Sequence, residues 1–167
     1  MKRFALWLAL VAVVIGLDQW SKFAVLARFV EYEALYVTDF FNLVLVYNPG
    51  AAFSFLANHS GWQRWFFVIL AAVICTWLLR MTWVHRHERL QPGAFSLVTG
   101  GAIGNVIDRL IHGKVVDFLD FHLAGSHWPA FNLADSAIFL GVVLMLIAQL
   151  RESLAEKRQQ KNRNPQP

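Results

Sequence analysis

Four long apolar stretches dominate the pattern of this chain. They cover residues 4–26, 65–79, 93–111 and 131–150. With a rise of about 1.5 Å per residue, helices of this length can cross a hydrocarbon core about 30 Å thick when their polar ends lie near an interface. The pattern therefore predicts four transmembrane helices.

Two of the intervening segments, residues 27–61 and 112–130, carry strand and turn signals. β-branched and aromatic residues favour a strand over 39–48, and Asn-Pro-Gly at 48–50 favours a turn after it. With the N-terminus in the cytoplasm, both segments lie on the outer side of the membrane. The sequence thus predicts a small β-rich part at the outer surface.

The second outer segment alternates with a period of two over residues 115–122. This alternation places Asp117 on one face together with Val115, Leu119 and Phe121. Because that face is otherwise apolar, we expect it to rest against the membrane helices and to direct Asp117 towards them.

The composition agrees with a membrane protein. Hydrophobic residues make up 57% of the 167 residues and charged residues 16%, with a mean hydropathy of +0.45. Soluble domains carry about 25% charged residues, and disordered chains combine low hydrophobicity with high charge. We therefore expect an all-α membrane protein with a β-rich cradle, one membrane domain over 1–150 and a basic tail over 151–167.

The basic residues set the expected orientation. Of the 15 Lys and Arg residues, 10 would lie on the cytoplasmic side with only three acidic residues, if both termini are cytoplasmic. The net charge of +4 therefore reflects the orientation of the chain in the membrane, with the basic tail lying beside anionic lipid. We expect no nucleic-acid partner. A cleaved N-terminal signal is the alternative for the first stretch, but no small-x-small cleavage pattern follows it.

Polar residues inside the apolar stretches are candidates for function, because ionisable groups within a span are costly. Asp18 and Lys22 are four residues apart and share a helix face, so they fit a structural ion pair as well as a substrate contact. Asn105, Asp108 and Arg109 lie on neighbouring turns of the third helix, where they fit either a site or hydrogen bonding between helices.

Small and polar residues mark two further positions in the third and fourth stretches. Gly100 and Gly104 form a small-xxx-small pair, which favours close helix packing. Asn132 and Asp135 are three residues apart, so we expect them on one face, just inside the outer end of the fourth helix.

Asp117 and Asp135 approach the same outer boundary from different segments. Two carboxyl groups held together in a poorly hydrated place share one proton, so that one accepts a proton from water while the other donates to a carbonyl oxygen. This is the chemistry of an aspartic protease. A proton relay in a transporter, with Asp18 as a third group, fits the same residues, and so does a scaffold in which the acids only pair with Lys22 and Arg109.

Other peptidase classes find less support in the sequence. The nearest match to a His-Glu-x-x-His metal motif, at 87–91, lacks the last histidine, so we expect no metal and no other cofactor. No serine has the neighbours of a Gly-x-Ser-x-Gly elbow, and Cys75 lies in mid-span without an acid–base partner.

Five motifs occur in the order and spacing of the lipoprotein signal peptidases, also called signal peptidase II. They are DQWSK at 18–22, NPGAAF at 48–53, GGAIGNVIDR at 100–109, VVDF at 115–118 and FNLAD at 131–135. The chain resembles this family over about residues 1–150. The resemblance implies an aspartyl endopeptidase of the bacterial inner membrane, with four helices, both termini cytoplasmic, and the active site near the periplasmic face.

The resemblance also implies a substrate and a set of roles. The substrate would be a prolipoprotein cut just before a cysteine that carries a diacylglyceryl group, and globomycin would inhibit the enzyme without any metal being involved. The implied roles are catalysis by Asp117 and Asp135, substrate contact by Asn48, Gly50, Asn105, Arg109 and Asn132, and structural support by Asp18, Lys22 and Asp108.

Overall fold

The computed structural model describes residues 1–50 and 61–163 of the chain. Within these residues, four helices are long and apolar enough to cross a membrane, which confirms the expected number. They are α1 (Lys2–Leu26), α2 (Trp62–Val84), α3 (Leu90–His112) and α4 (Leu133–Arg163). The apolar stretches locate each helix, but α2 is longer at both ends, and α4 continues for 13 residues beyond Leu150 through the basic segment.

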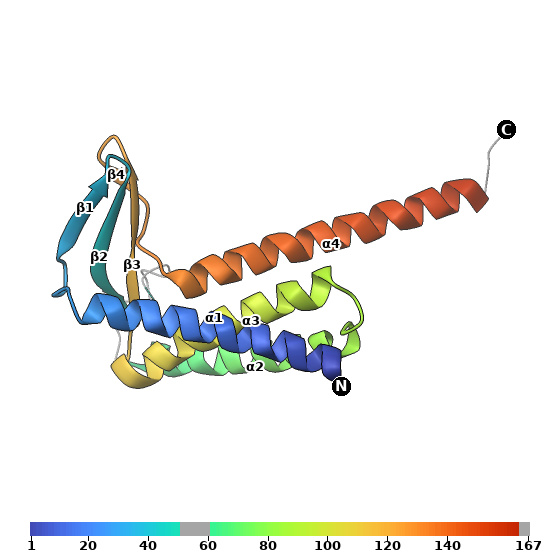
Figure 1. The fold of residues 1–167 in the computed structure, drawn as a ribbon, viewed down its shortest axis with the longest axis horizontal. Helices are drawn as coiled ribbons and strands as arrows, with labels where there is room; N and C mark the ends of the chain where they lie inside the picture. The colour runs from blue at the N-terminus through green and yellow to red at the C-terminus, as the bar shows by residue number, and fades with distance from the viewer. Residues whose placement is uncertain (51–60, 164–167) are drawn as a thin grey trace.

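Helix α3 lies at the centre of the bundle. It packs against each of the other three helices, and about half of its length is buried, whereas α1, α2 and α4 expose most of their apolar side chains. Figure 1 shows α1, α2 and α3 side by side, with the far end of α4 extending away from them. The exposed apolar faces of the outer helices are those that membrane lipid would cover.

Glycines allow α3 to approach its neighbours closely. A Cβ atom added to Gly100 would lie 2.7 Å from Val14 Cβ of α1, and one added to Gly104 would lie 2.5 Å from Asp18 Oδ2. The predicted small-xxx-small pair therefore does face another helix. Gly101, which the sequence pattern did not single out, meets α4, where an added Cβ would lie 2.3 Å from the Ala134 carbonyl oxygen.

We expect Gly101→Ala to destabilise the protein by about 1–3 kcal/mol, because the added methyl group would collide with the backbone of α4 rather than with a flexible side chain. Gly16→Ala is the matched control, since an added Cβ at Gly16 meets no atom within 4 Å. Thermal unfolding in detergent measures both. Equal melting temperatures for the two variants would contradict the close contact.

A four-stranded antiparallel sheet stands at one end of the bundle (Figure 1). Its strands are β1 (Ala34–Thr38), β2 (Phe41–Asn48), β3 (Val115–Leu123) and β4 (Ser126–His127), in the order β1-β2-β3-β4. The sequence pattern predicts β2 and β3. The shorter edge strands β1 and β4 were not predicted, because they form only when β2 and β3 offer backbone partners.

Strand β3 is more enclosed than simple alternation suggests. Its residues from Val115 to Phe118 are all buried, so both faces of this part are covered. Val116 and Phe118 pack in a core with Val25 of α1 and Leu45 of β2. The end of α1 therefore covers the face opposite to Asp117 and fixes β3 against the bundle.

Candidate active site

Asn132 caps α4 and thereby orients Asp135. The helix begins at Leu133, so Asn132 lies just outside it and not on its first turn as expected. The Asp135 backbone N–H donates to Asn132 Oδ1 (2.9 Å), and the Asn132 backbone N–H donates to Asp135 Oδ2 (3.3 Å). Asn is a preferred N-cap residue, and this reciprocal pair satisfies helix donors that would otherwise lack acceptors. The Asp135 side chain is thus held at the helix start.

Asp117 enters the site from β3. It is 1% exposed, and it accepts hydrogen bonds from the side chains of two amides. Asn132 Nδ2 donates to Oδ1 over 2.7 Å, and Asn48 Nδ2, at the end of β2, donates to Oδ2 over 2.9 Å. The strand therefore directs Asp117 towards the helices, as its sequence pattern predicted, and the structure shows that the contact is with Asn132 at the start of α4.

Asn105 of α3 completes the link between the two carboxyl groups. Its Nδ2 donates to Asp135 Oδ1 over 2.7 Å, while its Oδ1 accepts from Asn132 Nδ2 over 3.2 Å. Asp117 and Asp135 are thus bound to neighbouring amides of one hydrogen-bonded chain, although 18 positions separate them in the sequence. Three elements, β3, α3 and α4, contribute to this cluster.

The electrostatics of the cluster favour the protonated form of Asp117. Burial raises the pKa of Asp117 to about 7, and the negative charge of Asp135 acts in the same direction. The opposing hydrogen bonds from Asn48 and Asn132 are not strong enough to cancel this. Arg109 lies near enough for its charge to act on both carboxyl groups; its guanidinium also stacks on the Phe67 ring, 4.9 Å from the centroid.

A buried ionic cluster lies directly behind these residues. Lys22 Nζ is 2.8 Å from Asp18 Oδ2 and 2.8 Å from Asp108 Oδ2, and it donates to Asn105 Oδ1 over 3.1 Å. Lys22 is only 2% exposed. Of the two interpretations left open for Asp18 and Lys22, this geometry supports the structural ion pair.

The same carboxylates hold backbone groups of the site. Asp18 accepts the N–H of Ala134 at the start of α4 (2.9 Å), and Asp108 accepts the N–H of Val116 in β3 (3.0 Å). The segments that carry Asp117 and Asp135 are therefore both tied to the ionic cluster. Gln19 donates to Asp108 over 2.9 Å. No role was predicted for Gln19 from the sequence, although its position in the polar run 18–22 indicated that it could belong to the site.

Gly50 closes the turn that follows Asn48. Its N–H donates to Asn48 Oδ1 over 2.9 Å, and its φ of +113° is a conformation that favours glycine. A Cβ added there would also lie 2.7 Å from Phe67 Cε2. The rest of the motif that begins at Asn48, residues 51–53, lies outside the described residues.

A hollow opens beside Asp135. Its volume is about 440 Å³, and it is lined by Trp128, Phe131, Ser136 and Phe139 together with Asp135 itself. Asp135 is only partly buried, whereas Asp117 is enclosed. Among residues 1–50 and 61–163, no three His, Cys, Asp or Glu side chains are grouped as a metal site. The hollow is therefore an apolar space with one carboxyl group at its edge.

Comparison with known proteins places this chain in a family. A sequence model of the family described as Signal peptidase (SPase) II matches residues 10–151. The chain belongs to the signal peptidase II family. A lipoprotein signal peptidase of Azoarcus sp. (strain BH72) is 67% identical over 145 residues, which cover 87% of this chain and 82% of that relative. Another, from Ralstonia nicotianae, is 55% identical over 148 residues, covering 87% and 84%.

A solved structure confirms the fold of this signal peptidase II family member. It is described as a bacterial membrane enzyme determined by the in meso method at 2.3 Å resolution, and it is similar to this chain with a TM-score of 0.79 and 32% identity. The match covers 89% of this chain and 90% of that one. The chain is accordingly a multi-pass membrane protein of a peptidase family.

Proposed function

We propose that this chain is an aspartyl endopeptidase that removes signal peptides from diacylglyceryl-modified prolipoproteins, cutting just before the lipid-modified cysteine. Family membership supports the processing of lipoprotein signal peptides. The observation that carries the aspartic mechanism is the pair Asp117 and Asp135, joined through the amides of Asn105 and Asn132.

In this mechanism the two carboxyl groups have different tasks. Asp117 is enclosed and has a pKa of about 7, so it holds the proton of the pair near neutral pH. Asp135 borders the open hollow and accepts the proton of a water molecule that attacks the scissile carbonyl carbon. Asp117 gives its proton to the carbonyl oxygen. Collapse of the tetrahedral intermediate then breaks the C–N bond: Asp135 gives the proton that it took from water to the leaving amine, and Asp117 recovers a proton from a hydroxyl group of the intermediate as the product carboxyl group forms.

The neighbouring polar residues position these groups and the substrate. Asn105 and Asn132 fix the positions of the two carboxyl groups by hydrogen bonds. Asn48, whose side chain is held by the Gly50 turn, donates to Asp117. Arg109 supplies positive charge near the oxygen that becomes negative in the transition state. We assign the structural support of the site to its buried ionic cluster, which comprises Asp18, Lys22 and Asp108.

We further propose that the protein lies in the bacterial inner membrane with both termini in the cytoplasm and the sheet at the periplasmic face. The N-terminus and the far end of α4 lie at the opposite end of the molecule from the sheet (Figure 1). The basic residues of α4 and of the N-terminus would then be on the cytoplasmic side. A lipid-anchored substrate could reach the hollow beside Asp135 from the membrane.

The decisive experiment incubates the purified protein with a diacylglyceryl-modified prolipoprotein, with and without globomycin. We expect cleavage before the modified cysteine and its loss when globomycin is present. The same prolipoprotein without the lipid is the control substrate. Absence of cleavage together with solute flux in proteoliposomes would support the transporter interpretation, and absence of both would support a scaffold.

The pH dependence should report the proton held by Asp117. Because the mechanism needs that proton, kcat/KM is expected to fall about tenfold per unit as the pH rises above about 7. Asn48 stabilises the ionised form of Asp117 by its hydrogen bond. Asn48→Ala should therefore raise the pKa of Asp117 and move the alkaline fall in kcat/KM to higher pH. Initial rates measured across pH 5–9 (roughly two units either side of that pKa) check both expectations. If the fall in kcat/KM moved to lower pH in Asn48→Ala, its assignment to the Asp117 proton would be contradicted.

A further inference from the structure

The chain between the two aspartates folds back along the free edge of β3. Strand β4 pairs with β3 through His127 opposite His122, and residues 128–131 then continue beside β3. The Trp128 N–H donates to the Phe121 carbonyl (2.8 Å), and Phe131 exchanges two backbone hydrogen bonds with Leu119 (2.8 and 3.1 Å). We call residues 128–131 the return segment. It leads directly to Asn132 and α4.

The return segment forms one wall of the hollow beside Asp135. Trp128 and Phe131 belong to that wall, and the Phe131 ring stacks on Phe121 of β3 with 5.8 Å between centroids. Trp128 is 70% exposed, so its own packing holds it only weakly. Its position therefore depends on its backbone hydrogen bond to Phe121 and on how firmly the preceding residue, His127, is attached to the sheet.

His127 is attached through a buried carboxylate. Its Nδ1 lies 2.9 and 3.0 Å from the two carboxylate oxygens of Asp120, which also accepts a hydrogen bond from Asn42 of β2 over 3.0 Å. Burial would raise the pKa of Asp120, but the hydrogen bonds from Asn42 and His127 outweigh it and leave that pKa below its ordinary value. Asp120 is thus an acceptor, and Nδ1 of His127 carries the hydrogen. The His122 ring stacks on His127 at 4.9 Å.

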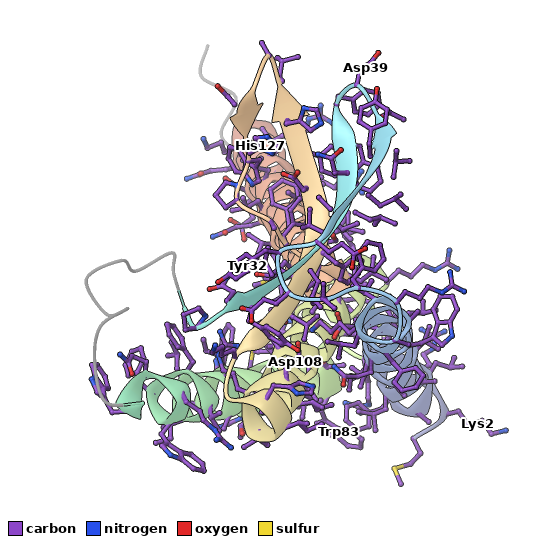
Figure 2. All side chains as sticks on the ribbon, turned by 90° about the vertical axis from the view of Figure 1, so that its left-hand side faces the viewer. Lys2, Tyr32, Asp39, Trp83, Asp108 and His127 are labelled. Atoms are coloured by element: carbon purple, nitrogen blue, oxygen red, sulfur yellow. The ribbon has the colours of Figure 1, made fainter. Side chains whose placement is uncertain are left out.

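These residues are separate from the catalytic cluster. Asp120 follows Asp117 by three positions in β3, so the two side chains point to opposite faces of the sheet. Figure 2 shows His127 high on the sheet, whereas Asp108 lies where the sheet meets the helices. The hydrogen bonds that hold Asp117 and Asp135 involve neither Asp120 nor His127. Loss of this contact should therefore leave the carboxyl pair in place.

We propose that Asp120 and His127 are positioning residues for substrate binding: their hydrogen bond holds the return segment against β3 and so places the aromatic wall of the hollow beside Asp135. This inference rests on the proposed function, because the substrate it concerns is the lipid-modified prolipoprotein. It predicts an effect on KM with little effect on kcat, since the wall contacts the substrate while the reacting carboxyl groups are held by other residues.

Two amide substitutions at His127 test the proposal. In His127→Asn, the side-chain amide nitrogen takes the place of Nδ1 and can still donate to Asp120. In His127→Gln, the amide is one carbon farther out, near the place of Nε2, so that donor is displaced. His127→Ala removes the donor, and Ser126→Ala is the control, because Ser126 is an exposed neighbour in the same strand.

We expect KM for the diacylglyceryl-modified prolipoprotein to rise about tenfold in His127→Ala and His127→Gln, as for the loss of a hydrogen bond to a charged group. His127→Asn and Ser126→Ala should stay within about twofold of the unchanged protein, and kcat should stay within about twofold in all four. Rates are referred to the folded fraction, measured by size-exclusion chromatography in detergent. If His127→Ala does not fold, the Asn and Gln variants alone decide the question.

Equal KM values for His127→Asn and His127→Gln would overturn the proposal, and so would a loss of kcat as large as the rise in KM. Failure of the proposed function would look different, because the unchanged protein would then not cleave the prolipoprotein at all. A wild-type protein that cleaves, together with a His127→Gln variant of unchanged KM, would reject the positioning role alone.

Discussion

Asp117→Asn and Asp135→Asn should each reduce prolipoprotein cleavage by about 10³-fold or more, while the protein still inserts into the membrane and accumulates. An amide can occupy the same volume and keep some of the hydrogen bonds. It cannot hold and release the proton that the pair must exchange with water and with the carbonyl oxygen. Single-turnover cleavage of a diacylglyceryl-modified prolipoprotein by purified enzyme measures the effect.

Asp39→Asn is the matched control for these variants. Asp39 is exposed near the tip of the hairpin between β1 and β2, far from the helices (Figure 2). The Asp39→Asn variant should therefore cleave the prolipoprotein at the rate of the unchanged protein. Near-normal cleavage by Asp117→Asn or by Asp135→Asn would show that the two residues are not the catalytic pair.

Lys22→Met should cause the largest loss of stability, about 3–5 kcal/mol, because it leaves the carboxylates of Asp18 and Asp108 buried without their shared positive charge. Met preserves most of the side-chain volume, so the loss reports the charge. The melting temperature in detergent should fall by roughly 10 °C, by the scale that relates unfolding free energy to melting temperature.

Two further variants separate this effect from a general loss of positive charge. Lys2→Met removes an exposed charge at the start of α1 and should leave the melting temperature unchanged. Adding Asp18→Asn to Lys22→Met should recover part of the lost stability, because it removes one unpaired carboxylate while its amide oxygen can still accept the Ala134 N–H. A double variant less stable than Lys22→Met would contradict the charge argument.

Close approach along α3 was only partly predictable. The pair Gly100 and Gly104 is visible as a spacing of four, and it does meet α1. Gly101 and Gly141 have no glycine four residues away in the sequence, yet an added Cβ at Gly141 would lie 2.6 Å from Val98 of α3. Which helix a glycine faces depends on how the helices are rotated within the bundle. A helix that is apolar on all of its faces does not specify that rotation.

The cap of α4 shows a second limit of the sequence pattern. A spacing of three between Asn132 and Asp135 fits one helix face as well as a reciprocal cap. Only the structure shows that the helix begins after Asn132, which frees its amide to reach Asp117 and Asn105. As the cap of α4, Asn132 connects the two carboxyl groups: its backbone N–H donates to Asp135 and its side-chain amide donates to Asp117. Inside the helix, the backbone N–H of Asn132 would instead have donated within the helix.

The sequence by itself determined four membrane-spanning helices, the two central strands of the sheet and the family, because these depend on local runs of apolar residues, on alternation, and on short motifs. The tertiary structure decided which polar residues meet. Lys22 reaches Asp108 across 86 positions, and Asp117 reaches Asp135 through the amides of Asn105 and Asn132. In an apolar interior each buried polar group must find a partner, and only the packing of helices and sheet decides which partners lie within hydrogen-bond distance.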